Sequence, residues 1–310
     1  MGRLHLTTKV PEGRLSSLLS HSPIVYPRFV EDLSEPKPAL RPGSFAALLR
    51  QELIACARSY AEKHALTPTE SYGQSPVLCF RAENGSHGNF HPRSYRAILA
   101  NPKWTLRLQK PHTSARSALP RCDYTWRELD SSMSSDALLM NIFCFPKLIA
   151  RREVIQLLGI EPGLAPEFGV KARVPLKSGR VDRTEIDLRL GNLLVESKLT
   201  ETGFQQKPLS VFETYRDLDH VFDVERLPRA GNYCLGYQLV RNVLAAFATN
   251  SSFCVMLDRR RPDLLEEWYR IMSCVVETDL RTRCKVLTWQ ELAAVVPDSL
   301  RKFLALKYGI

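Results

Sequence analysis

Apolar residues recur at helical spacing in the first regularly patterned segment of the chain, which runs from about Ser44 to His64. Because this spacing lines one face of a helix, and because Pro42 and Gly43 precede it, the segment predicts an amphipathic helix. The apolar positions are Phe45, Leu48, Leu49, Leu53, Ile54 and Ala57. The first forty or so residues are instead punctuated by prolines, which disfavour a long helix.

Residues 68–120 lack a comparable pattern and are rich in Pro, Gly, Ser and His. This composition predicts loops with short strands, for example around Val77–Phe80 and Trp104–Leu108. Apart from the predicted helix, residues 1–130 therefore form an irregular region in which no motif is recognised.

The pattern becomes regular after residue 130. Ser131–Asp136 is a run of good helix-capping residues, and the apolar-periodic segment Ala137–Leu158 follows it. Pro146 lies inside that segment, so we expect the helix to kink or to split there. Strands are predicted at Gly169–Val174, Thr184–Leu190, Leu193–Lys198, Ser252–Leu257 and Lys285–Thr288. Further helices are predicted at Tyr233–Ala248, Leu264–Val275 and Trp289–Val296.

The order of these elements predicts an α/β fold in which helices flank a central mixed sheet. Residues 131–310 would form this domain, preceded by the basic region of residues 1–130. No apolar run approaches the roughly 20 residues that cross a bilayer. The N-terminus also lacks the apolar run of a signal peptide. We therefore expect a cytoplasmic protein without a membrane partner.

The chain carries a net charge of +10, and part of it is concentrated between His91 and Arg127. Eight Lys and Arg residues lie in that stretch against one acid, with four aromatic residues interleaved. Basic side chains hold phosphates and aromatic rings stack on bases, so the stretch predicts nucleic-acid binding. A solvated basic face with its rings turned inward explains the composition equally well. The candidate binding residues are Arg93, Arg96, Lys103, Arg107 and Lys110.

Two acids and a lysine fall on neighbouring predicted strands that are joined by the turn residues Gly191 and Asn192. Side chains alternate along a strand, so Asp187 and Glu196 come close together if the two strands pair across this turn. Lys198 then lies one step further along the second strand. The apolar residues 193–195 indicate that this second strand is buried.

Two carboxylates that converge at the end of a buried strand repel each other unless a positive charge lies between them. Mg²⁺ prefers oxygen ligands and commonly uses one or two carboxylates, so Asp187 and Glu196 are the candidate metal ligands. Lys198 is a compact charge suited to hold an attacking water or to stabilise developing negative charge. The alternative is a surface hairpin whose acids form ordinary salt bridges with Arg189 and Lys198.

The arrangement of Asp187, eight intervening residues and then Glu196-Ser197-Lys198 resembles the signature of the PD-(D/E)XK nuclease superfamily. The predicted order from residue 137 to about 257 is similar to the superfamily core of a helix, a three-strand meander, a helix and a further strand. Ile186 stands where the superfamily name has proline. The resemblance implies a restriction-endonuclease-like core and a Mg²⁺-dependent nuclease, in which Mn²⁺ can substitute. Its catalytic residues would be Asp187, Glu196 and Lys198.

The resemblance also implies two supporting polar residues. Superfamily members often carry a Glu on the first core helix, and Glu153 is the candidate, with Glu161 and Glu167 as alternatives. Many members carry a polar residue on the helix after the lysine, a place that Gln238 fits. Arg241 follows one turn later as a further candidate for nucleic-acid binding.

Residues Ser134–Phe143 and Gly236–Asn242 are similar to a group of bacterial restriction-endonuclease-like proteins. Asn242 stands where one exonuclease branch has tyrosine, which argues against that branch. The expected activity is therefore that of an endonuclease, with DNA favoured over RNA as the substrate. A homodimer is one arrangement that the sequence leaves open. Two alternatives are a nuclease-like module that binds nucleic acid or assembles complexes without cleaving, and a protein that keeps only the sheet. The complete Asp, Glu and Lys set argues against the first, and the basic stretch against the second.

Overall fold

The computed structural model describes residues 43–71, 77–112, 120, 122 and 124–310. The first forty residues, and Arg116 and Arg121 of the basic stretch, lie outside the described residues. The described part of the chain is built around a five-stranded sheet with the strand order β14-β13-β9-β8-β5. Its strands are β5 (Glu167–Lys171), β8 (Glu185–Leu190), β9 (Leu193–Ser197), β13 (Ser252–Leu257) and β14 (Cys284–Thr288).

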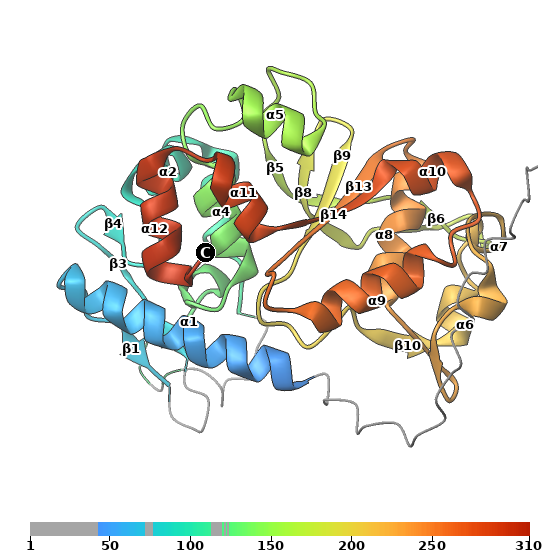
Figure 1. The fold of residues 1–310 in the computed structure, drawn as a ribbon, viewed down its shortest axis with the longest axis horizontal. Coiled ribbons are helices and arrows are strands. Elements are labelled where there is room, and N and C mark those ends of the chain that lie inside the picture. Colours follow the sequence, from blue (N-terminus) through green and yellow to red (C-terminus); the bar gives the residue numbers. More distant parts are fainter. Residues whose placement is uncertain (1–42, 72–76, 113–119, 121, 123) are drawn as a thin grey trace, which may run out of the picture. The chain divides into compact units, whose positions relative to one another are not determined.

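The strands β5, β8 and β9 form an antiparallel meander, and β13 and β14 extend it parallel to β9. Gly191 and Asn192 join β8 to β9, and Leu190 pairs with Leu193 across this turn. Gly191 has a φ of 57°, the left-handed conformation that tight hairpin turns require. The predicted hairpin and the predicted mixed α/β fold are therefore confirmed (Figure 1).

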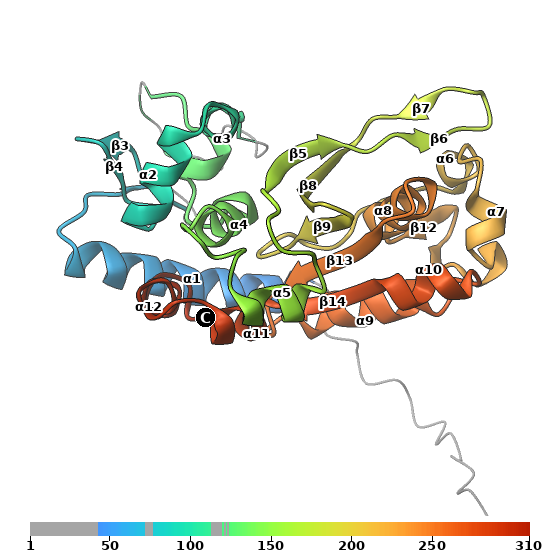
Figure 2. The same ribbon diagram turned by 90° about the horizontal axis from the view of Figure 1, so that it is seen from above.

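Helices cover both faces of the sheet, whose strands lie side by side in Figure 2. One face carries α4 (Ser135–Phe143), α5 (Arg152–Leu158), α11 (Trp289–Val295) and α12 (Asp298–Tyr308). The other face carries α8 (Tyr237–Ala248) and α9 (Pro262–Met272). Alternation along β13 supplies both cores, since Cys254 and Met256 pack into the first and Val255 into the second.

The predicted helix from Ala137 to Leu158 is split, as the internal proline predicts. α4 ends at Phe143, before Pro146, and α5 begins at Arg152. The Oγ of Ser134 caps α4 by accepting a hydrogen bond from the N–H of Ala137 at 3.1 Å. The capping run seen in the sequence therefore marks the start of the first core helix.

Several short elements connect the core strands and helices. A three-stranded antiparallel sheet with the order β10-β12-β11 precedes α8. The predicted helix from Tyr233 is wrong in its first turn, because Tyr233–Leu235 forms β12 and Gly236 ends it with a φ of 71°. The elements are β6 (Val174–Pro175), β7 (Val181–Asp182), β10 (Gln206–Pro208), α6 (Leu209–Phe212), α7 (Leu218–Val221), a 3-10 helix (Val224–Arg226), β11 (Arg229–Ala230), β12 and α10 (Thr278–Arg283).

The N-terminal part begins with the predicted helix, α1 (Gly43–Lys63). The strand expected at Trp104–Leu108 is wrong, because α3 occupies this place. Asn101 caps α3 by accepting from the N–H of Lys103 at 3.0 Å, and the proline that follows it is favoured in a first helical turn. The other elements are β1 (Thr69–Glu70), β2 (Leu78–Cys79), β3 (Ala82–Glu83), β4 (Ser86–His87), α2 (Pro92–Ala100), α3 (Pro102–Arg107) and a 3-10 helix (Glu128–Asp130).

These N-terminal elements pack on the helices of the first face, α1 against α12 and α2 against α4. Residues 40–310 group into one compact unit, and the boundary expected near residue 130 stays a prediction. Within the described ranges, no helix combines the length and the apolar character needed to cross a bilayer.

Candidate active site

The two predicted acids and the lysine meet where β8 and β9 lie beside the first turn of α8. Glu196 pairs with Val255 in β13, so the polar end of β9 is held inside the sheet. The N–H of Lys198 donates to the carbonyl of Met256 at 2.8 Å, and its own carbonyl accepts from Trp289 Nε1 at 2.9 Å. Glu196 and Lys198 are only 2% and 5% exposed. The backbone thus holds both side chains in defined places.

Lys198 and Glu196 form a buried ion pair that α8 completes. Lys198 Nζ donates to Glu196 Oε1 at 2.8 Å and to Gln238 Oε1 at 2.9 Å. Asn242, one turn after Gln238, donates from Nδ2 to Glu196 Oε2 at 2.8 Å. Burial alone would lower the pKa of Lys198, but Glu196 and two further acids raise it above its ordinary value. Lys198 is therefore held as an ammonium ion, and one of its three N–H donors is left for a ligand.

Asp187 approaches this pair from β8. Its Oδ2 accepts hydrogen bonds from the backbone N–H of Ser197 at 2.7 Å and from Ser197 Oγ at 3.0 Å. Burial, and then the negative charges of Glu196 and Asp136, raise the pKa of Asp187 to about 8. Lys198 and the Ser197 N–H oppose this increase only in part. Positive charge is therefore in deficit beside Asp187.

The donor set fits a small divalent cation such as Mg²⁺. A cation between Asp187 and Glu196 would supply the missing positive charge. Mg²⁺ commonly takes one or two carboxylates and fills its other positions with water and phosphate oxygens. Within the described part of the chain, no group of three or more His, Cys, Asp and Glu side chains could hold a metal ion. As a pair, the two carboxylates would leave the other positions of the ion to water and substrate.

A third acid, Asp136 in the first turn of α4, is close enough to raise the pKa of Asp187. Asp136 is 5% exposed, and its Oδ2 accepts from Arg107 Nη2 at 3.0 Å and from Lys110 Nζ at 2.5 Å. Arg107 also pairs through Nη1 with Glu185 Oε1 at 2.6 Å. Two of the predicted nucleic-acid-binding residues thus lie beside the site, where acids balance their charge.

The structure does not bring Glu153 to this cluster. Glu153 lies on α5 with its side chain 56% exposed, and its ionic partner is Arg151 at 3.6 Å. The break at Pro146 is the reason, because it leaves α4 beside the site and sends α5 to a different place on the sheet. The alternatives also lie outside the cluster, since Glu161 is exposed and Glu167 pairs with Arg189.

The remaining predicted nucleic-acid-binding residues differ in exposure. Arg93 and Arg96 on α2 and Lys103 on α3 are exposed. Arg241 is only 3% exposed and donates from Nη2 to Asn242 Oδ1 at 3.0 Å. It therefore orients Asn242, which in turn holds Glu196, and it does not face solvent.

The aromatic residues of the basic stretch are mostly turned inward. Tyr95 and Trp126 are each 5% exposed, and Trp104 is half-buried with its Nε1 donating to the Pro166 carbonyl. Tyr124 is 37% exposed. The composition that suggested stacking on bases thus largely reflects packing, while three of the basic side chains that the structure describes stay open to solvent.

Three polar residues of the site were not predicted from the sequence. Asn242 carried a usable signal, because it lies four residues after Gln238 and must share its helix face. The sequence places Asp136 in a helix-capping run. Its proximity to Asp187 depends on how α4 packs on the sheet, which the local sequence does not predict. Ser197 lies between Glu196 and Lys198, and no local pattern predicts its two hydrogen bonds to Asp187.

Comparison with known proteins gave one family match. The model of a family described as restriction endonuclease associating with ARP matches residues 55–309. No curated protein and no solved structure matched the chain. The matched range includes the five-stranded sheet and every residue of the acid and lysine cluster. The chain therefore belongs to this restriction-endonuclease-like family, restriction endonuclease associating with ARP.

Proposed function

We propose that the protein is a Mg²⁺-dependent endonuclease that hydrolyses phosphodiester bonds of DNA. The observation that carries this proposal is the buried Glu196 and the half-buried Asp187 beside a lysine that is held as an ammonium ion. The raised pKa of Asp187 marks the place where positive charge is missing. Family membership supports an endonuclease acting on DNA. A pure binding module would gain nothing from two clustered acids facing a polyanion.

Asp187 and Glu196 would hold the cation, with Mn²⁺ able to substitute for Mg²⁺. Bound there, the ion would polarise a phosphoryl oxygen and lower the pKa of a water molecule. Asn242 keeps Glu196 oriented through Oε2, and Ser197 keeps Asp187 oriented through Oδ2. These contacts hold the two acids in place before any ligand arrives, which limits the reorganisation that catalysis requires.

Lys198 would donate its remaining N–H to the attacking water or to a phosphate oxygen. Glu196 and Gln238 occupy its other two donors and therefore set its direction. Because its ammonium form is stabilised, Lys198 acts as a donor and a positive charge when negative charge develops on the phosphate. The exposed Arg93, Arg96 and Lys103 would hold the phosphate backbone away from the reacting bond.

The proposal is tested with supercoiled plasmid, single-stranded DNA and RNA, each incubated with Mg²⁺, Mn²⁺ or EDTA. Wild type is compared with Asp187→Ala and Lys198→Ala, and the exposed Glu153→Ala is the matched control. We expect metal-dependent cutting of plasmid that both site variants lose and the control keeps. Binding without cutting would favour the inactive module. Cutting that survives both substitutions would place the active site elsewhere.

A further inference from the structure

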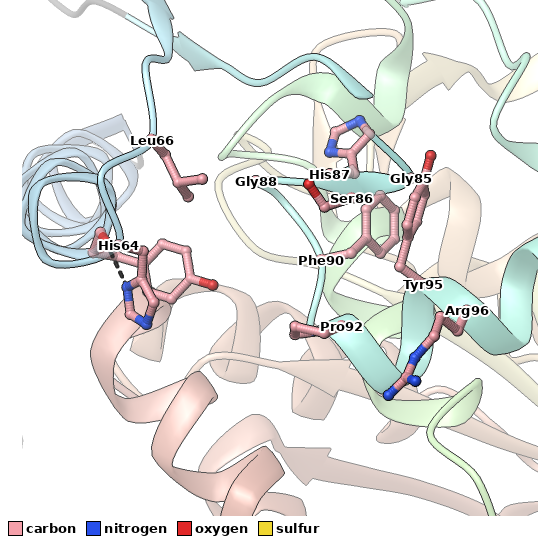
Figure 3. Close-up of a pocket in the computed structure, with 11 residues that line it drawn as sticks. His64, Leu66, Gly85, Ser86, His87, Gly88, Phe90, Pro92, Tyr95 and Arg96 are labelled. Atoms are coloured by element: carbon pink, nitrogen blue, oxygen red, sulfur yellow. Dashed lines mark hydrogen bonds between the residues drawn. The ribbon is translucent and has the colours of Figure 1, made fainter. Parts of the chain in front are cut away.

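A pocket of about 210 Å³ lies between the end of α1, the β3–β4 hairpin and the start of α2 (Figure 3). In Figure 3, His64 and Leu66 form one side, and Phe90 and Tyr95 face them from the other. Tyr60 also lines it. Neither the acid and lysine cluster nor the proposed chemistry uses this pocket.

The walls of the pocket are mainly rings that the fold holds in place. Tyr60, Phe90 and Tyr95 are 6%, 2% and 5% exposed. The rings of Phe90 and Tyr95 lie 5.6 Å apart with their planes inclined by 30°, and His87 meets Phe90 edge-on at 5.1 Å. A pocket built from buried rings exists before a ligand binds and favours a flat, apolar surface.

His87, which lines the pocket, has no free ring nitrogen for chemistry. Its Nε2 lies 3.1 Å from Asp130 Oδ1, and its Nδ1 accepts from the N–H of Asn89 at 3.1 Å. The pocket therefore suits binding by stacking and shape. Its volume is below the roughly 300–1,000 Å³ of pockets for drug-sized ligands, so it suits a single planar ring system.

The charge at the mouth of the pocket is positive. Arg96 lines it and is exposed, and Arg93 lies almost one turn earlier on the same helix. The described lining residues include no acid. No ion pair within the described part of the chain involves either arginine. An anionic group on the ligand would therefore find the exposed guanidinium of Arg96 next to the planar site.

A planar ring system attached to an anion is the chemistry of a nucleotide. We propose that this pocket binds a nucleobase whose phosphate lies against Arg96. A base in a strand and a free nucleotide share this chemistry, and the arms of the test separate them. We favour an unpaired base of the DNA substrate, so the inference rests on the proposed function.

The connection to the site supports the strand as the source. Helix α4 links the two places: Asn141 accepts from the N–H of His91 at 2.6 Å, next to the pocket, and Asp136 lies at the other end of the helix. Five residues of helix span about 7.5 Å. After α2 and α3, the chain reaches Arg107 and Lys110, which contact Asp136. One strand could therefore contact both the pocket and the site.

Two substitutions test the pocket from different sides. Ser86→Trp places a large side chain at an exposed lining position, and Ser210→Trp makes the same change on α6 as the matched control. Phe90→Leu keeps an apolar wall but removes a ring. Stacking contributes about 1–3 kcal/mol per base, so we expect nucleotide binding to weaken about 5- to 150-fold in Ser86→Trp and Phe90→Leu. The control should bind as wild type does.

The first arm uses ligand-observed NMR without metal, with deoxynucleoside monophosphates compared with ribose 5-phosphate. Contact with base protons, lost in both pocket variants, supports a nucleobase site. Equal binding of the sugar phosphate would overturn it. The second arm measures binding of an oligonucleotide and of the same oligonucleotide with abasic sites. Tighter binding of the intact strand supports the strand as the source. Binding of monophosphates alone would overturn the strand and leave a free-nucleotide site.

The result is separable from the proposed function, because neither arm depends on cleavage. If the plasmid is not cut but bases bind in the pocket, the endonuclease proposal fails and the pocket inference stands. If the plasmid is cut and the pocket variants bind every probe as wild type does, the pocket inference fails alone.

Discussion

Asp187→Asn should make the metal-free protein more stable while it abolishes cutting. The substitution removes the charge but keeps a carbonyl oxygen that can accept from both groups of Ser197. The pKa of Asp187 in the folded protein is about 8, against an ordinary value of 3.8. A difference of about four units corresponds to an upper bound of roughly 5–6 kcal/mol. Because Asp187 is half-buried and solvent can relax around it, we expect about 2 kcal/mol.

The sign of the effect gives the prediction a pH window. The folded state keeps a proton on Asp187 between about pH 4 and 8, where the unfolded chain has lost it. The stability of the wild type therefore falls as the pH rises through this window, and Asp187→Asn escapes that loss. The advantage of the variant should be small at pH 5, grow up to pH 8 and stay constant above it.

Thermal unfolding in EDTA at pH 5, 6.5 and 8 measures this advantage. About 2 kcal/mol corresponds to a rise in Tm of roughly 3–4 °C for a chain of this size. Asp219→Asn is the control, because its side chain is 71% exposed. Added Mg²⁺ should raise the Tm of the wild type and leave that of Asp187→Asn unchanged. Equal stability of the two proteins at all three pH values would refute the charge deficit and remove the main argument for a cation.

Three further substitutions test the surroundings of Asp187. Lys198→Met should slow cutting about 100- to 1,000-fold in single-turnover assays and leave DNA binding in a mobility-shift assay intact; a loss of binding instead would contradict its role at the reacting phosphate. Asn242→Ala should raise the Mg²⁺ concentration for half-maximal cutting about 10-fold, and an unchanged metal titration would show that Asn242 does not position Glu196. Asp136→Asn should free Arg107 and Lys110 for phosphates. The plot of the logarithm of the DNA-binding constant against the logarithm of the salt concentration should then become steeper by about one to two released ions. An unchanged salt dependence of DNA binding would mean that Arg107 and Lys110 stay paired with other acids.

The core of the fold could be predicted because its signals are local. β13 coincides with the predicted strand Ser252–Leu257, a short apolar run between two helical patterns. The hairpin of β8 and β9 follows from alternation on both sides of Gly191. Once that hairpin is assigned, Asp187 and Glu196 must lie near each other. The pairing of the two acids therefore follows from the amino-acid sequence alone.

The first core helix shows where the sequence is insufficient. Pro146 predicts a break, but the sequence does not say which half of the broken helix meets the sheet near Asp187. The resemblance places Glu153 there, whereas Asp136 is the acid that the structure brings close. The choice depends on how α4 and α5 pack, which is a property of the whole core and not of either segment.

The N-terminal helices escape prediction for a different reason. α2 and α3 each begin with a polar cap followed by proline, at His91-Pro92 and at Asn101-Pro102. Proline is favoured in the first turn of a helix, yet within a segment rich in Pro and Ser the same residues suggest a loop. The sequence of the basic stretch therefore predicts loops, although two short helices form in its first part and bring Arg107 to the site.

The charges around the site also account for how metal and DNA could assist each other. In the free protein, Arg107 and Lys110 balance Asp136, and Asp136 still raises the pKa of Asp187. DNA phosphates that draw Arg107 and Lys110 away from Asp136 would leave more uncompensated negative charge beside Asp187. This charge would strengthen the attraction for a cation. A cation bound there would, in turn, reduce the repulsion between the acids and the phosphate. Because coupling between two ligands is reciprocal, the same groups would make each bind more tightly in the presence of the other.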